Sequence, residues 1–112
     1  MGGGQGQHPE RTSGVVIRFR PEARADVQSA YDWYEEKESG LGDRLVDAID
    51  AVLDRVAANP RLFPKAHQEF RRAVLSQFPY CVYFVVQPAY ILVVGVLHGR
   101  QDLRRLFERL RR

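Results

Sequence analysis

The sequence predicts an α+β fold in which an N-terminal helical hairpin packs on one face of a small, mainly antiparallel sheet. Three observations support this class. Two stretches with apolar residues at helical spacing follow each other across a short glycine-containing break. Two apolar runs rich in Val, Ile, Tyr and Phe then read as adjacent strands. An amphipathic stretch ends the chain, so the expected order is β-α-α-β-β-β-α.

The first strand and the first helix are predicted from the beginning of this pattern. Residues 15–20 alternate loosely and are expected to form a strand. Pro21 then opens a helix, because its missing N–H is not needed in the first turn. The helix is expected to end near Glu38. Its apolar positions are Ala23, Val27, Ala30 and Tyr34, with Tyr31 and Trp33 beside them.

The second helix has the clearest pattern in the chain. It follows the break at residues 39–42 and should end at Asn59-Pro60, because a residue before proline avoids the helical region. Its apolar stripe comprises Leu45, Val46, Ile49, Val52, Leu53 and Val56, and its water-facing acids are Asp47, Asp50 and Asp54. The short connection makes the two helices an antiparallel hairpin.

The second half of the chain predicts a three-stranded meander and a last helix. A loop over residues 61–68 precedes a strand at 71–75, and a hairpin then joins strands at 80–86 and 90–97 across Gln87-Pro88-Ala89. Because strand side chains alternate, one face should carry Tyr80, Val82, Phe84 and Val86, and the other Cys81, Tyr83 and Val85. We expect the Phe84 face to lie under the helical hairpin. After Gly99, the final helix is predicted by Leu103, Leu106, Phe107 and Leu110.

Composition indicates one cytoplasmic domain. The 112 residues suit a single domain at 14–112, preceded by a Gly-rich tail at 1–13 that we expect to be disordered. The single cysteine, Cys81, excludes an internal disulfide, and its place within an apolar strand indicates a buried structural thiol. No apolar run reaches the ~18 residues of a membrane span, and the N-terminus lacks the hydrophobic region of a signal peptide.

Charge divides the chain into an acidic helical half and a basic half. Residues 22–59 carry three Arg and one Lys against ten acids, and residues 61–112 carry nine Arg and one Lys against three acids. This asymmetry favours an anionic or acidic partner for the second half. The alternative is that each face is simply solvated.

Most kinds of reactive site are not indicated. His67 and His98 are 31 residues apart with no metal-binding spacing around them, and no phosphate loop or nucleophile with a base is recognisable. We therefore expect no metal and no cofactor. The basic groups that remain are Arg71, Arg72, His98 and Arg100. They could bind an anion, with His98 as an acid or base, or they could pair with helix carboxylates or protect an edge strand.

Short motifs in a fixed order lie within residues 15–107, the part of the chain that carries the pattern. They are Pro-Glu-Ala-x-x-Asp-Val from Pro21, Gly-Leu-Gly-Asp-Arg-Leu-Val from Gly40, Asn59-Pro60-x-x-Phe63-Pro64, Arg71-Arg72-x3-Ser76-x-Phe78-Pro79-Tyr80, and His98-Gly99-Arg100-Gln101-Asp102. The set resembles the RelE/ParE toxin superfamily of type II toxin–antitoxin systems. The resemblance implies a toxin that inhibits growth, a role in plasmid stabilization, and a hetero-oligomer with a cognate antitoxin that wraps across its surface.

The superfamily contains two mechanisms, and the resemblance favours its ParE-like branch. ParE-like members are associated with poisoning DNA gyrase, which here gives the C-terminal helix, with Arg104, Arg105 and Arg109, as the target-binding surface. RelE-like members cleave messenger RNA on the ribosome with basic residues, and the corresponding catalytic set would be Arg71, Arg72, His98 and Arg100. No Tyr or His follows His98, which departs from the ribonuclease pattern. A second alternative is a non-toxic binding module of the same fold.

Overall fold

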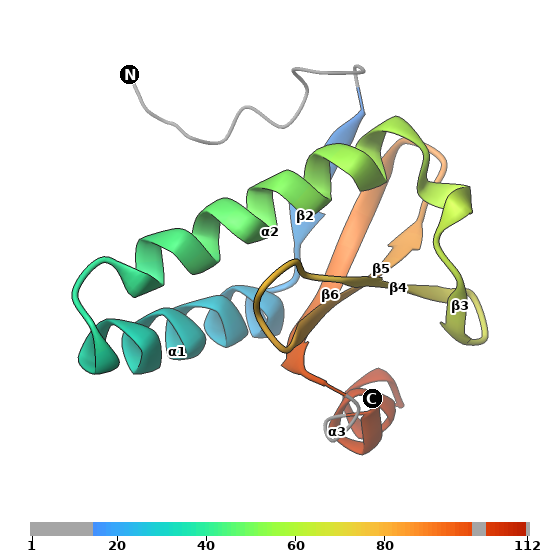
Figure 1. Ribbon diagram of the computed structural model, residues 1–112. Helices are drawn as coiled ribbons and strands as arrows, with labels where there is room; N and C mark the ends of the chain where they lie inside the picture. Colours follow the sequence, from blue (N-terminus) through green and yellow to red (C-terminus); the bar gives the residue numbers. More distant parts are fainter. Residues whose placement is uncertain (1–14, 100–102, 112) are drawn as a thin grey trace.

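A computed structural model describes residues 15–99 and 103–111 of the 112-residue chain. The elements, in order, are β2 (Val16–Phe19), α1 (Pro21–Lys37), α2 (Leu41–Ala58), the short 3-10 helix η1 (Pro60–Leu62), β3 (Lys65–His67), β4 (Phe70–Val74), β5 (Tyr80–Val86), β6 (Tyr90–His98) and α3 (Leu103–Leu110) (Figure 1). The expected N-terminal tail at 1–13 lies outside the described residues.

The strands form one five-stranded sheet in the order β2-β6-β5-β4-β3. β2 runs parallel to β6, with Val16 opposite Tyr90, and the other neighbours pair antiparallel. The predicted α+β class and the order of the long elements are therefore confirmed. The prediction of a plain loop over residues 61–68 was wrong, because this segment contains η1 and β3. β3 has only three residues, which is too short to show an alternating pattern.

The helical hairpin lies across one face of the sheet, and α1 and α2 run side by side (Figure 1). Phe84 and Val82 are fully buried beneath it, in one cluster with the α2 residues Leu45, Ile49 and Val52. The prediction that the Phe84 face packs under the helices is thus confirmed. Val46, which was expected in the stripe, is only partly buried and lies outside this cluster.

The turn between the helices depends on two glycines. Gly40 has φ +92°, a backbone conformation that residues with a Cβ atom rarely adopt. Gly42 lies so close to α1 that a Cβ atom at this position would be 2.8 Å from the Tyr31 ring. This distance is too short for a side chain, so the close approach of the two helices requires glycine here. The Glu35 carboxylate accepts the backbone N–H of both glycines, each at 2.8 Å, and so satisfies donors at the start of α2.

The opposite face of the sheet is covered in part by α3. Leu106, which is fully buried, forms a second cluster with Cys81, Tyr83, Val94 and Leu97. Cys81 is 6% exposed, as expected for a structural thiol. Burial raises the pKa of its thiol, and the nearby Arg72 charge opposes this rise. The sheet is thus a layer between the helical hairpin and α3.

Candidate functional site

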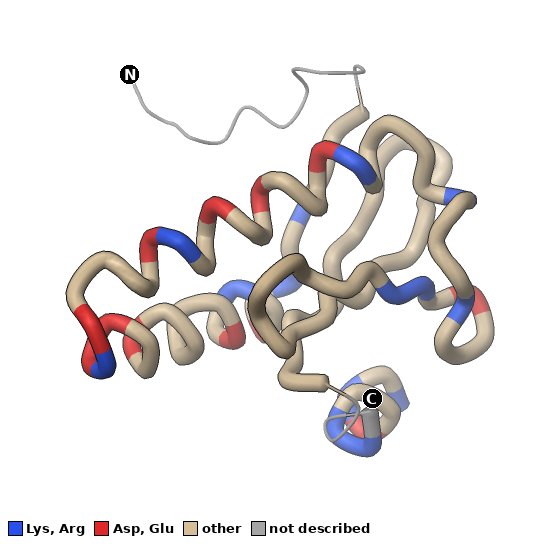
Figure 2. The backbone as a smooth tube through the Cα atoms, in the orientation of Figure 1, with Lys and Arg blue, Asp and Glu red and all other residues tan. Residues whose placement is uncertain are grey.

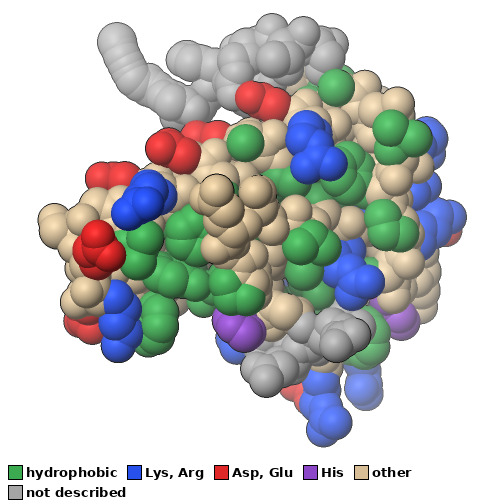
Figure 3. Space-filling model, in the orientation of Figure 1, with side chains coloured by type: hydrophobic (Ala, Val, Ile, Leu, Met, Phe, Trp, Pro, Cys, Tyr) green, Lys and Arg blue, Asp and Glu red, His purple; other side chains and the backbone are tan. Residues whose placement is uncertain are grey.

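The two charge classes occupy different parts of the molecule. Acidic residues follow one another along the outer side of α2, while basic residues gather on α3 and near β3 and β4 (Figure 2). Asp47, Asp50 and Asp54 are exposed, as the sequence predicted. Space-filling shows apolar side chains gathered between the two helices below this acidic row (Figure 3). The molecule therefore presents an acidic helical side and a basic side.

Arg71 and Arg72 lie on opposite faces of the sheet. Arg71 is paired opposite Phe84 and therefore shares the face of the helical hairpin, whereas Arg72 is paired opposite Tyr83 on the α3 face. The Arg71 guanidinium donates a hydrogen bond of 2.6 Å to the carbonyl oxygen of Phe63. This contact gives Arg71 a structural role in holding the segment before β3 against β4.

His98 lies at the end of β6, well away from both arginines. Its ring is exposed and stands edge-on to the Tyr80 ring, with centroids 5.3 Å apart. Tyr80 is the residue opposite His98 on β5, four positions from Phe84, so His98 and Arg71 are separated by ~13 Å along the strand. Arg100 lies outside the described residues. The described members of this basic set are therefore not gathered at one point.

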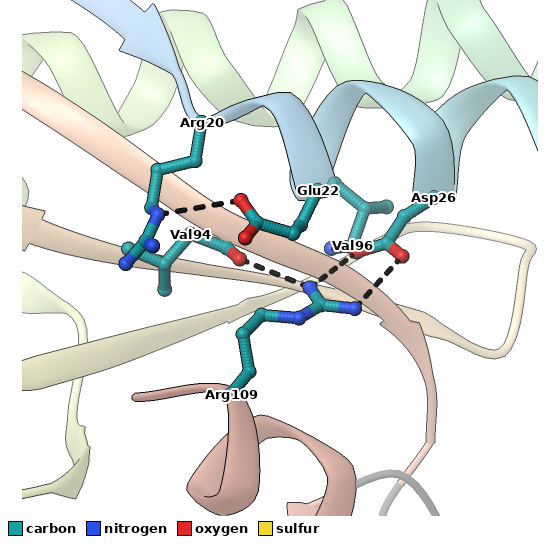
Figure 4. A network of polar contacts seen from close by, with 6 residues as sticks. All are labelled: Arg20, Glu22, Asp26, Val94, Val96 and Arg109. Atoms are coloured by element: carbon teal, nitrogen blue, oxygen red, sulfur yellow. Dashed lines mark hydrogen bonds and ion pairs between the residues drawn. The ribbon is translucent and has the colours of Figure 1, made fainter. Parts of the chain in front are cut away.

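The arginines of α3 divide into two groups. Arg104, Arg105 and Arg111 are exposed, whereas the side chain of Arg109 is only 14% exposed. Arg109 points inward to Asp26 of α1, whose side chain is 8% exposed. Its Nη1 lies 2.9 Å from Asp26 Oδ2, and its Nη2 lies 3.3 Å from Asp26 Oδ1 (Figure 4).

The same ion pair is bonded to the backbone of β6. Arg109 Nη1 donates to the Val94 carbonyl oxygen at 3.1 Å, and the Val96 N–H donates to Asp26 Oδ2 at 3.0 Å (Figure 4). A charged pair this deeply buried is tolerated because its polar atoms have such partners. The Asp26–Arg109 pair therefore fixes α3 to both α1 and the sheet. Sequence reasoning missed it, since the two residues are 83 positions apart.

A cleft of about 610 Å³ opens beside this ion pair, between α1, α3 and the adjoining ends of β5 and β6. Its lining includes Ser29, Trp33, Tyr34, Tyr80, His98 and Arg105. Trp33 is 52% exposed, a large apolar surface for a single side chain. The Tyr34 ring meets Trp33 and Phe78 edge-on, at 5.0 and 5.1 Å, and burial raises the pKa of its phenol. The cleft is thus an aromatic recess with basic groups on its rim.

The described ranges give no support for metal binding or for a membrane span. No group of three or more His, Cys, Asp or Glu side chains at 15–99 and 103–111 is placed to hold a metal ion. Across the same residues, none of the helices has both the length and the apolar character needed to cross a membrane. What the described residues do form is the aromatic cleft, with the exposed arginines of α3 beside it.

Comparison with known proteins gives two findings. Residues 17–103 match the family model described as "ParE toxin of type II toxin-antitoxin system, parDE". The chain is also similar to a chain of the solved structure titled "Chromosomal ParDE TA system from P. aeruginosa", with a TM-score of 0.68 and 17% sequence identity over 77% of this chain and 97% of that chain. No curated protein matches. At 17% identity the structural similarity establishes a shared fold.

Proposed function

Because this chain belongs to the ParE toxin family of type II toxin–antitoxin systems, we propose that it is the toxin of such a module and that it poisons DNA gyrase when its antitoxin is absent. The observation that carries the proposal is the family match over residues 17–103, which includes both helices of the hairpin and all the strands except Val16 of β2. The cognate antitoxin is the partner that neutralises it.

The distribution of basic residues supports gyrase poisoning over messenger RNA cleavage. Cleavage by attack of a 2′-hydroxyl on the neighbouring phosphate needs a base, an acid and cations around one phosphorus atom. Arg71 and Arg72 lie on opposite faces of the sheet, and His98 lies ~13 Å along the strand from Arg71. Such separated groups do not favour one catalytic centre.

The exposed side of α3 is the surface we assign to the target. Arg104 and Arg105 are both exposed, and a cationic patch of this kind suits an acidic protein surface through fast, oriented association. Arg109 has a different role from the one expected from the sequence pattern. Because it is paired with Asp26 inside the molecule, it positions α3 and thereby the two exposed arginines.

Toxicity relieved by a partner is the first expected result. Induction of the chain alone in bacteria should stop growth, and co-induction of the small gene that accompanies it should restore growth, because toxins of this family are held inactive by a co-expressed antitoxin. Growth curves with immunoblots of the soluble fraction measure this. Normal growth at verified soluble expression would contradict the proposal.

Charge reversal on α3 is the second expected result. The double variant Arg104→Glu with Arg105→Glu should lower toxicity at least ~tenfold, counted as surviving colonies after induction, because it repels an acidic target. The double variant Arg44→Glu with Arg61→Glu makes the same charge change at exposed positions on α2 and η1. It should stay fully toxic. Equal toxicity of the two variants at equal soluble levels would show that α3 does not meet the target.

A further inference from the structure

Gly95 is a buried glycine within β6, an otherwise largely apolar strand of nine residues. Glycine weakens the interior of a strand, and there it commonly marks a bulge or a place where another element comes close. Tyr83 is paired opposite Gly95, whereas the next residue of β5, Phe84, is paired opposite Val93. Val94 is therefore an extra residue that forms a β-bulge directly before Gly95.

The space that a side chain of Gly95 would occupy is filled by α3. A Cβ atom at this position would lie 3.2 Å from Arg109 Nη1 and 3.4 Å from Leu106 Cδ1. Both distances are shorter than the separation at which non-bonded atoms attract each other best. Leu106 is the fully buried residue of α3, and Arg109 is the partner of Asp26. Gly95 therefore lies beneath the two side chains that hold α3 on the sheet.

Arg109 has little freedom to move away from a larger residue at position 95. Its Nη1 is bonded to Asp26 Oδ2 at 2.9 Å and to the Val94 carbonyl oxygen at 3.1 Å. A shift of the guanidinium would lengthen these bonds, and buried charged groups are costly to leave without partners. Leu106 has no exposed surface toward which it could turn. A side chain at position 95 is therefore accommodated by displacement of α3 as a whole.

We propose that Gly95 is a positioning residue for the target-binding surface of α3. Its missing side chain lets α3 lie close enough to β6 for Arg109 to reach Asp26. The exposed arginines of the same helix, Arg104 and Arg105, are thereby held in place for the target. Their contact with the target rests on the proposed function, whereas the docking of α3 over Gly95 rests on the distances given above. Gly95 itself is buried and acts only through α3.

Alanine at position 95 gives the first test, because strand propensity and packing predict opposite signs. The φ of Gly95 is not positive, and alanine loses less backbone freedom on folding than glycine, so in open space Gly95→Ala would stabilise the protein. We expect the urea midpoint of unfolding to fall instead. In the background Asp26→Asn with Arg109→Met, the flexible methionine side chain can turn away. There the same substitution should not lower the midpoint.

This comparison separates the contact with α3 from an effect on the strand alone. An effect of the strand alone would be the same in both backgrounds, because it does not involve Arg109. A higher or unchanged midpoint for Gly95→Ala in the unmodified chain, or an equal fall in both backgrounds, would overturn the role of Gly95.

Toxicity gives the second test, with two substitutions that both introduce valine. Gly95→Val adds a branched side chain where α3 lies, so toxicity should fall at least ~tenfold, counted as surviving colonies after induction, because the arginines of a displaced α3 no longer meet the target together. Ile49→Val shortens a buried side chain of the cluster under the helical hairpin, which lowers stability on the other face of the sheet. It should stay fully toxic.

Amide hydrogen exchange of the same two variants follows α3 directly. Gly95→Val should lose protection of the backbone amides at residues 107–110, and Ile49→Val should keep it. Full toxicity of Gly95→Val at equal soluble level, or unchanged protection of α3, would overturn the proposal. An unmodified chain without toxicity would overturn the proposed function, and the two backgrounds of Gly95→Ala would still decide whether Gly95 positions α3.

Discussion

Replacing Phe84 by Ala will lower the free energy of unfolding by about 3–5 kcal/mol. Phe84 has no exposed surface, lies at the centre of the cluster under the helical hairpin, and packs edge-on against Phe63 with ring centroids 6.0 Å apart. Removal of the ring leaves a cavity that the sheet on one side and α2 on the other cannot close. Equilibrium unfolding in urea measures the change.

The control for this substitution is Val74→Ala on β4. Val74 is 62% exposed, so its truncation should alter the free energy of unfolding by no more than about 0.5 kcal/mol. A loss below about 1 kcal/mol for Phe84→Ala would mean that the central strand packs differently from the arrangement described.

Replacing Arg109 by Met will also destabilise the protein strongly. The substitution leaves the Asp26 carboxylate buried without its cation, and breaking a buried pair in this way costs about 3–5 kcal/mol. Adding Asp26→Asn to Arg109→Met should recover part of this loss, because both charges are then gone and the amide oxygen can still accept the Val96 N–H. Urea unfolding of the single and double variants gives the two free energies.

An exposed ion pair provides the comparison. Arg44 and Glu38 are 3.9 Å apart, and both side chains are 65% exposed, so Arg44→Met should change the free energy of unfolding by at most about 0.5 kcal/mol. A cost for Arg109→Met as small as that for Arg44→Met would show that the Asp26–Arg109 pair does not hold α3 in place.

Local sequence signals were sufficient for the helices and for the orientation of the central strand. Pro21 and Asn59-Pro60 mark helix ends through the backbone restrictions of proline, and α1 begins at Pro21 as expected. The alternation in β5 places Phe84 under the hairpin and Cys81 on the other face, and both assignments are confirmed. These features depend on residues close together in the chain.

The features that sequence reasoning missed depend on distant parts of the chain. The parallel pairing of β2 with β6 joins Val16 to Tyr90, and nothing in either segment specifies the partner. In the sequence Asp26 is recognisable only as part of the motif that begins at Pro21, and Arg109 is expected on the target-binding surface of the final helix. Their burial follows from the packing of α3 across the sheet, which brings positions 83 residues apart into contact.

The measurement that tests the proposed toxin function most directly follows gyrase and messenger RNA in the same induced culture. Covalent gyrase–DNA complexes are recovered from lysed cells and counted, and full-length transcripts are followed in parallel. We expect trapped complexes to accumulate soon after induction while transcripts stay intact, and both readouts to stay at their uninduced level when the antitoxin is co-induced. Rapid transcript cleavage without trapped gyrase would contradict gyrase poisoning. It would instead support a ribonuclease site formed by Arg71, Arg72, His98 and Arg100.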